Sequence, residues 1–365
     1  MEKSKRPNIE FFVKYLLESQ INKKLKRRLP PVQPPDPTST EEYEYALAWA
    51  AQYVKKVDRD LFIMYLHIKF LNETLDYKPV LSQYENREFA QKETWKPNKK
   101  ILYLFRGINK GTYIKEVIKA NMNWLYTDSG YLEYLPPLKE IHPGGKKFRR
   151  IVYNGMHDLG TMSAVEVFKR TQAIIDESAL KKRFRKHTGQ SFDDFKLNHG
   201  EKINRGDKIL LVVPSEKVIL WYKGITLGKS WDKTQLKNPK GTYIKQWKED
   251  FIRELRAHTD KEIVIREKPP ILDRRVNPLY NELKTGKYHC VVTYNSIASI
   301  ESVVMGIPCI CLGENAGSYL SETKIENVEN PYFPEINKIR DHLLYLCCMQ
   351  FKTPEILNGF WYKLF

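Results

Sequence analysis

Apolar and polar positions follow two different periods along this chain. Short apolar runs that read as strands alternate with segments whose apolar residues recur every three or four positions. In the first half the expected strands are ILYLFRG (101–107), NWLYTDSGY (123–131) and FRRIVYNG (148–155), and the expected helices are 112–121 and 164–177. Strands that alternate with helices predict a parallel α/β layer.

A second alternating unit follows a hydrophilic stretch at residues 180–207. Its expected strands are KILLVVPS (208–215), EIVIREK (262–268), HCVVTYNS (289–296) and PCICLG (308–313). An amphipathic helix is expected at 242–257, and another helix runs to Met305, with Gly306 as its stop. The sequence therefore predicts an α/β protein with two Rossmann-like domains.

The first 98 residues differ in the spacing of their apolar residues and in their charge. Phe11, Phe12, Tyr15 and Leu16 recur at helical spacing, and a basic run occupies residues 23–28. A proline-rich stretch then breaks the chain, and a second helical pattern follows it. We expect a basic, helical N-terminal extension.

Composition and charge narrow the choice of partner. The 365 residues include 42% hydrophobic and 29% charged residues, a globular composition. No apolar run is long enough to span a membrane, and the N-terminus lacks a signal-peptide pattern, so a cytoplasmic protein is expected. The net charge of +17 favours a polyanionic partner: nucleic acid, an anionic polysaccharide or an acidic membrane surface.

Two motifs that could suggest a metal are set aside. The five cysteines match no zinc-site spacing and are expected to be buried free thiols: Cys290, Cys309, Cys311, Cys347 and Cys348. Asp58-Arg59-Asp60 contains an Asp-x-Asp pattern, but it lies in a helical amphipathic segment rather than after an apolar strand. We interpret it as a solvated helix face, so no metal is required.

The segment VVTYNSIASIESVVMGIPCICLG (291–313) is the most informative for chemistry. A strand leads into a helix whose first turn carries Ser296 and Ser299, with Glu301 close behind. A helix N-terminus beyond a parallel strand offers N–H groups and positive potential to a phosphate, although Ser296 could instead be a helix cap. Ser-x-x-Ser-x-Glu, followed by Gly-x-Pro before an apolar strand, resembles the donor-binding helix of GT-B glycosyltransferases.

This resemblance implies a GT-B fold and a nucleotide sugar as co-substrate, here a UDP-sugar, with no tightly bound cofactor. In that family the glutamate typically holds the ribose, while serines and backbone N–H groups hold the diphosphate; Glu301, Ser296 and Ser299 occupy the matching positions. Ser302 stands where many members have alanine, a mild departure.

The resemblance also suggests the domain plan. The C-terminal stretch EILNGFWYKLF (355–365) resembles the closing helix that crosses back to the first domain in GT-B proteins. The expected parts are an extension (1–98), an acceptor-side domain (99–205), a donor domain (206–345) and a closing helix that packs on the first domain (346–365).

Further donor contacts are expected at the ends of two strands. Arg266 and Lys268 stand at alternate positions, so they point to the same side of the strand. They could neutralise a departing nucleoside diphosphate without a metal, or they could simply be a solvated strand end. Ser215 also follows a strand and is a candidate phosphate contact.

The first half supplies candidates for the acceptor cleft. YTDSGYL (126–132) and RRIVYNGMHDLG (149–160) resemble segments of phage proteins of GT-B appearance. Asp128 lies at a strand end and is the first candidate for the base that deprotonates the acceptor hydroxyl, with His157 the second. Asp128 could alternatively cap the turn at Ser129-Gly130. Other residues expected in the cleft are Arg106, Arg150 and Asn154.

Basic clusters bear on the acceptor. The candidate DNA contacts are Lys146, Lys147, Lys182, Arg183 and Arg185. The leading hypothesis is an inverting, metal-independent phage enzyme, active in the host cytoplasm, that glycosylates a flipped hydroxymethylcytosine-like base in double-stranded DNA. The alternative is a capsule or lipopolysaccharide type of transferase acting on an anionic glycan. A second alternative is a non-catalytic DNA-binding protein on a degenerate transferase scaffold.

Overall fold

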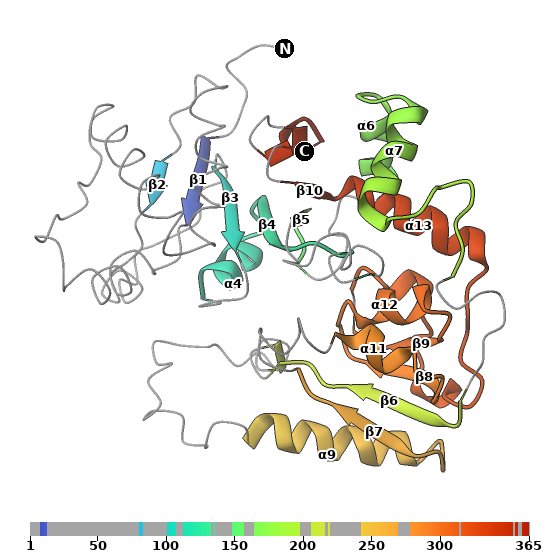
Figure 1. The fold of residues 1–365 in the computed structure, drawn as a ribbon. Helices are drawn as coiled ribbons and strands as arrows, with labels where there is room; N and C mark the ends of the chain where they lie inside the picture. The colour runs from blue at the N-terminus through green and yellow to red at the C-terminus, as the bar shows by residue number, and fades with distance from the viewer. Residues whose placement is uncertain are drawn as a thin grey trace, which may run out of the picture. The chain divides into compact units, whose positions relative to one another are not determined.

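The structure is a computed structural model that describes fourteen segments of the chain. They are residues 8–12, 80–82, 101–106, 112–132, 135, 148–156, 164–197, 206–215, 218–219, 242–268, 278–313, 315–352, 355–356 and 360–364. Contacts divide the chain into two compact units, one formed by Met1–Asp128 and Lys352–Phe365 and the other by Ser129–Phe351 (Figure 1).

A six-stranded sheet has the strand order β10-β5-β4-β3-β1-β2. Its strands are β1 (Asn8–Phe12), β2 (Val80–Ser82), β3 (Ile101–Arg106), β4 (Trp124–Ser129), β5 (Phe148–Tyr153) and β10 (Gln350–Lys352). The pairs β1–β2, β1–β3 and β3–β4 are parallel, and α4 (Thr112–Lys119) connects β3 with β4. These bounds confirm the alternation of strand and helix predicted after residue 100.

The prediction of a helical N-terminal extension is wrong where the structure describes that region. Residues 8–12 form β1, which pairs with β3 on one side and with β2 on the other. The five-residue run NIEFF is too short for its period to separate helix from strand, and pairing with distant strands decides its conformation. Residues 13–79, including Asp58 and Asp60, lie outside the described segments.

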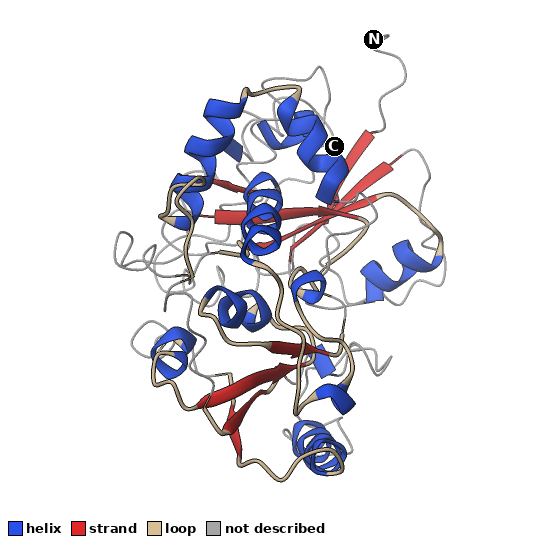
Figure 2. Ribbon diagram, turned by 90° about the vertical axis from the view of Figure 1, so that its right-hand side faces the viewer, coloured by secondary structure: helices blue, strands red, loops and turns tan. Residues whose placement is uncertain are grey.

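The second sheet is parallel throughout, with the order β7-β6-β8-β9. Its strands are β6 (Lys208–Val212), β7 (Ile263–Arg266), β8 (Tyr288–Thr293) and β9 (Cys309–Cys311). Helix α9 (Thr242–Arg256) covers one face, and α11 (Leu279–Leu283) and α12 (Ala298–Val304) lie on the other (Figures 1 and 2). Apolar side chains of alternate strand positions, such as Leu211 and Val292, pack against Phe251 and Leu255 of α9. The predicted α/β alternation of this half is confirmed.

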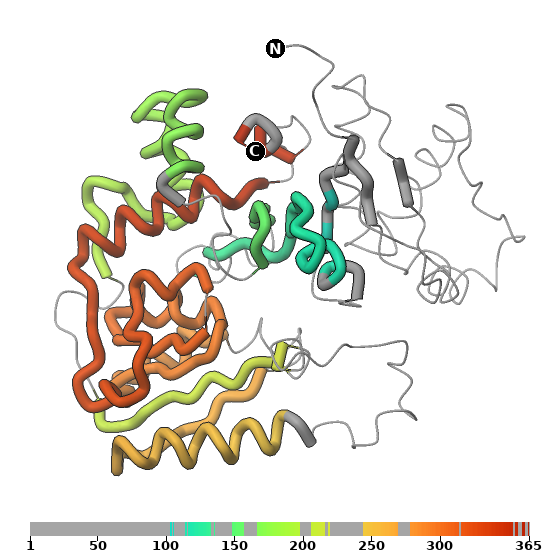
Figure 3. The backbone as a smooth tube through the Cα atoms, turned by 180° about the vertical axis from the view of Figure 1, so that it is seen from behind, coloured from blue at the N-terminus to red at the C-terminus, as the bar shows by residue number. Residues whose placement is uncertain are grey.

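Three helices of the unit Ser129–Phe351 pack against one another. They are α6 (Ala164–Gln172), α7 (Glu177–Thr188) and α13 (Ile336–Cys348), and α13 contacts both of the others (Figure 3). Asp176 caps α7 by accepting a hydrogen bond from the Ala179 N–H at 2.7 Å, and Gly189, at φ 78°, ends it. The hydrophilic stretch at 180–207 therefore begins as a helix, because the buried Leu180 and Phe184 form an inner face among the cations.

The remaining short elements are 3-10 helices. They are η3 (Ser318–Leu320), η4 (Ile325–Asn327) and η5 (Phe360–Leu364). None of the described helices combines the length and the apolar character needed to cross a bilayer.

Candidate functional site

The strand order of the second sheet reverses between β6 and β8. From β6 the chain crosses to β7 on one side, and it then returns past β6 to β8 on the other. Val212 pairs in register with Thr293, so the segments that follow these two strands leave the sheet side by side. Ligands of open α/β sheets bind beyond the carboxyl ends of the strands at such a reversal. We call residues 213–215 and 294–301, which continue from β6 and β8, the switch-point site.

Two buried polar groups of the switch-point site have no hydrogen-bond partner among the described residues. They are Ser215 Oγ and Asn295 Nδ2. The Asn295 side chain is only 5% exposed. A buried donor or acceptor left unpaired costs about 1–3 kcal/mol, so such groups call for a functional explanation. Asn295 was not among the predicted site residues, although it directly precedes Ser296 in the turn from strand to helix.

Glu301 is the buried carboxyl of the switch-point site. It lies in α12, every residue of which is buried, and it is itself 7% exposed. Its carboxyl makes no hydrogen bond to a described residue. Burial raises its pKa to about 7, and the positive charge of Arg266 opposes that rise. A carboxylate in this setting is stabilised by any ligand that donates hydrogen bonds to it.

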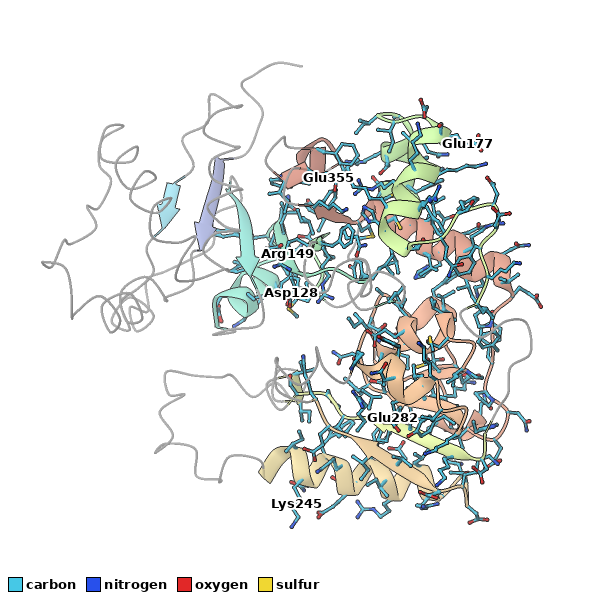
Figure 4. The ribbon with its side chains drawn as sticks, viewed as in Figure 1. Asp128, Arg149, Glu177, Lys245, Glu282 and Glu355 are labelled. Atoms are coloured by element: carbon cyan, nitrogen blue, oxygen red, sulfur yellow. The ribbon has the colours of Figure 1, made fainter. Side chains whose placement is uncertain are left out.

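Arg266 approaches Glu301 from β7. Because Arg266 and Thr293 both pair with Val212, they point to the same face of the sheet. The Arg266 guanidinium lies 3.7 Å from the Glu282 carboxylate of α11, which also accepts a hydrogen bond from the Tyr288 hydroxyl (Figure 4). The charge of Arg266 is therefore shared between two carboxylates, Glu282 and Glu301.

Neither Glu282 nor Tyr288 was a predicted site residue. Burial, followed by the hydrogen bond to Glu282, raises the pKa of the Tyr288 phenol. Lys268, two residues beyond Arg266, is exposed, whereas the Arg266 side chain is 15% exposed. The two cations proposed from sequence thus differ in setting, one held within the fold and one at its surface.

The two serines of the donor motif also differ in setting. Ser296 Oγ accepts a hydrogen bond from the Ala298 N–H at 3.2 Å, and the residue is half-buried. Ser299 is fully buried, and its hydroxyl lies 2.9 Å from the Ser296 carbonyl and 3.0 Å from Asn315 Oδ1. A Cβ added to Gly317 would overlap it. The Ser299 hydroxyl is therefore used in packing the 315–317 turn against α12, and its expected contact with a diphosphate stays a prediction.

The candidate base, Asp128, lies at the end of β4. Tyr126 donates a hydrogen bond from its hydroxyl to Asp128 Oδ2 at 2.9 Å, and the carboxylate is half-buried (Figure 4). Asp128 belongs to one compact unit and the switch-point site to the other. Its action on an acceptor bound near the donor therefore stays a prediction.

The other acceptor-side candidates have mixed outcomes. Arg150 of β5 is 5% exposed, and its guanidinium lies over the Tyr131 ring at 5.3 Å. Asn154 follows β5 in the left-handed region, with φ 51°, where asparagine is enriched. The structure describes only the backbone of Arg106, in β3. The candidates outside the described segments are His157, Lys146 and Lys147.

The basic run on α7 is divided between core and surface. Arg183 is 6% exposed, and it donates hydrogen bonds to the carbonyls of Cys347 at 2.7 Å and Gln350 at 2.6 Å. The first bond anchors α7 to the end of α13 and the second anchors it to β10, while the expected role of Arg183 as a DNA contact stays a prediction. Lys182 and Arg185 are exposed. In the part of the chain that the structure describes, no group of three or more His, Cys, Asp or Glu side chains is placed to hold a metal ion.

Comparison with known proteins gives little at the level of sequence. No protein-family model matches the chain, and no curated protein matches it. Among solved structures, the chain is similar to Thermosulfurimonas dismutans KpsC, beta Kdo 2,7 transferase, at 13% identity and a TM-score of 0.36, covering 80% of this chain and 93% of that chain. It is also similar to KpsC, beta Kdo 2,4 transferase, of the same organism, at 12% identity and a TM-score of 0.34, covering 82% and 87% of the two chains. Likeness at these TM-scores assigns no function to the chain.

Proposed function

We propose that this protein is a glycosyltransferase that binds a nucleotide sugar at the switch-point site and transfers the sugar to a hydroxyl of an acidic glycan. The observation that carries the proposal is the gathering of three groups on neighbouring segments: the buried and unpaired Ser215 Oγ and Asn295 Nδ2, and the buried Glu301 carboxyl, which makes no hydrogen bond to a described residue. A nucleotide sugar has the complementary groups. Ribose hydroxyls donate to Glu301, and phosphate oxygens accept from the amide and the serine hydroxyl.

The reaction follows from these roles. The acceptor oxygen attacks the anomeric carbon, the bond from that carbon to the phosphate oxygen breaks, and its electron pair leaves with the nucleoside diphosphate. Asp128 takes the proton of the acceptor hydroxyl. Arg266 and Lys268 stabilise the charge that develops on the leaving diphosphate, and Ser296 at the start of α12 adds a polar contact.

The choice of acceptor rests on the charges of α7. The net charge of +17 still favours an anionic acceptor. Arg183 is withdrawn into the fold, and Lys181 forms ion pairs with Asp193 and Glu177. The run LKKRFRKH thus presents fewer free cations to a phosphate backbone than its sequence suggests, which favours a glycan over DNA.

Calorimetric titration of the full-length protein with UDP tests the donor site. Asn295→Ala and Glu301→Gln should each weaken UDP binding at least tenfold, because each removes a group expected to contact the ligand. Asn337→Ala, an exposed asparagine of α13, is the matched control and should bind like wild type. Failure of the wild-type protein to bind UDP or any other nucleotide would refute the donor site.

Transfer is tested with a panel of nucleotide sugars and two acceptors, acidic oligosaccharides and duplex DNA that contains hydroxymethylcytosine. A mass gain of one sugar on the oligosaccharide supports the proposal, and a gain on the DNA base alone would overturn its acceptor. Asp128→Asn should retain UDP binding and lose transfer, since only the base is removed.

A further inference from the structure

Helix α7 and the loop after it line an open surface cavity of about 470 Å3. We call it the α7 cavity. Its helical lining residues recur at spacings of three and four, so they share one face of α7 (Figure 4 labels Glu177 at this helix). The lining includes Ser178, Lys181, Lys182 and Arg185 from the helix and Ser191 and Phe192 from the loop.

The cations of the α7 cavity are of two kinds. Lys181 is neutralised, because its ammonium lies 2.8 Å from an Asp193 oxygen and 3.4 Å from a Glu177 oxygen. The side chains of Lys182 and Arg185 are exposed and form no ion pair or hydrogen bond with a described residue. Two positive charges are therefore available to a ligand.

The apolar wall of the cavity is fixed in place. The Phe192 ring packs edge-on against Phe184, with centroids 5.2 Å apart, and the Arg340 guanidinium lies 4.4 Å from its centroid. Phe184 is itself fully buried. The Phe192 ring is thus fixed by its packing, and it lies beside two free cations and two serine hydroxyls.

We propose that the α7 cavity binds a carboxylate-bearing sugar unit of an acidic glycan. Lys182 and Arg185 pair with the sugar carboxylate, and Phe192 contacts the apolar C–H surface of the ring. Ser178, Ser191 and the carboxylate of Glu177 exchange hydrogen bonds with the sugar hydroxyls. That this glycan is the acceptor of the transfer rests on the proposed function.

The same observations argue against a nucleic acid as occupant. Duplex DNA carries one negative charge per about 1.7 Å of its axis, so tight binding needs an array of phosphate contacts. The α7 cavity offers two free cations, because its third cation, Lys181, is already paired with Glu177 and Asp193. Two charges match one or two sugar carboxylates better than a continuous row of phosphates.

The test is a calorimetric titration of the protein, without nucleotide, using tetragalacturonic acid, maltotetraose and a 12-base-pair duplex DNA. Wild type should bind tetragalacturonic acid and should bind neutral maltotetraose at least tenfold more weakly. Lys182→Ser/Arg185→Ser should weaken tetragalacturonate binding at least tenfold. Lys186→Ser/Lys196→Ser removes the same charge from exposed positions that do not line the cavity, and it should change binding less than twofold.

Three results would overturn the proposal. The first is an equal loss of tetragalacturonate binding in the two double variants, which would mean diffuse charge attraction. The second is the absence of tetragalacturonate binding by wild type. The third is binding of the DNA alone that depends on Lys182 and Arg185. UDP titration of the same variants separates this inference from the donor site. Both double variants should bind UDP like wild type. If tetragalacturonate does not bind at the α7 cavity but UDP binding is intact, only this inference is rejected. If wild type does not bind UDP, the proposed donor site is rejected.

Discussion

Replacing Asn295 with leucine should make the ligand-free protein more stable while abolishing nucleotide binding. The amide is 5% exposed, and its Nδ2 is unpaired among the described residues. Leucine has the same number and branching of side-chain heavy atoms, so the change removes an unsatisfied donor without opening a cavity. Relief of about 1–3 kcal/mol is expected. At the midpoint of that range, Tm should rise by roughly 4–8 °C for a unit of this size.

Thermal unfolding with and without UDP measures both effects. Wild type should gain about 2.7 kcal/mol of stability at UDP concentrations near 100 times Kd, whereas Asn295→Leu should gain almost nothing. Asn337→Leu, at an exposed position of α13, should change the free energy of unfolding by less than about 0.5 kcal/mol and keep the UDP response. An Asn295→Leu variant that is less stable than wild type and still stabilised by UDP would refute the assignment of Asn295 to the ligand site.

Three other changes follow from the described contacts. Because burial raises the pKa of Glu301 to about 7, above its ordinary 4.5, the folded state holds this proton more tightly than the unfolded state, and stability should fall as pH rises from 4.5 through 7. Glu301→Gln should remove that decline, on the order of 3 kcal/mol, in denaturant titrations at several pH values; an unchanged pH profile would contradict the burial of the carboxyl. Arg183→Lys should cost about 1–3 kcal/mol of folding stability, since one ammonium cannot reproduce the two hydrogen bonds to the carbonyls of α13 and β10, and it should leave tetragalacturonate binding unchanged. A binding defect without a loss of stability would show that Arg183 contacts the ligand instead. Gly317→Ala should destabilise the protein by about 1–3 kcal/mol through overlap with the Ser299 hydroxyl, and a neutral result in thermal unfolding would show that the turn yields instead.

The second sheet could be predicted from sequence because its strands are continuous apolar runs bounded by polar or glycine residues. Gly306 was expected to stop a helix, and it follows α12 at φ 81°, a conformation that favours glycine. Strand β1 could not be predicted in the same way, since its partners lie about 70 to 90 residues further along the chain. Local periodicity carries no information about such pairings.

The candidate site was predicted in part. Glu301, Arg266 and Ser215 were expected, and each lies at or beside the carboxyl end of the second sheet. Ser299 and Arg183 illustrate the limit of motif reasoning, because residue type alone does not distinguish a hydroxyl or guanidinium that serves a ligand from one that satisfies backbone carbonyls. Asn295 could be identified only from the structure, because its evidence is a buried Nδ2 atom without a hydrogen-bond partner.

The five cysteines are all buried and free, so their alkylation can report the local opening of two parts of the chain. Cys290, Cys309 and Cys311 belong to β8 and β9, whereas Cys347 and Cys348 end α13. Burial raises the pKa of Cys309, of Cys311 to about 11 and of Cys348 to about 11, so thiolate is scarce in the closed state. Alkylation will therefore proceed at the rate at which each segment opens. Mass spectrometry of the modified peptides can time the opening of the second sheet separately from that of α13, without introducing a single label.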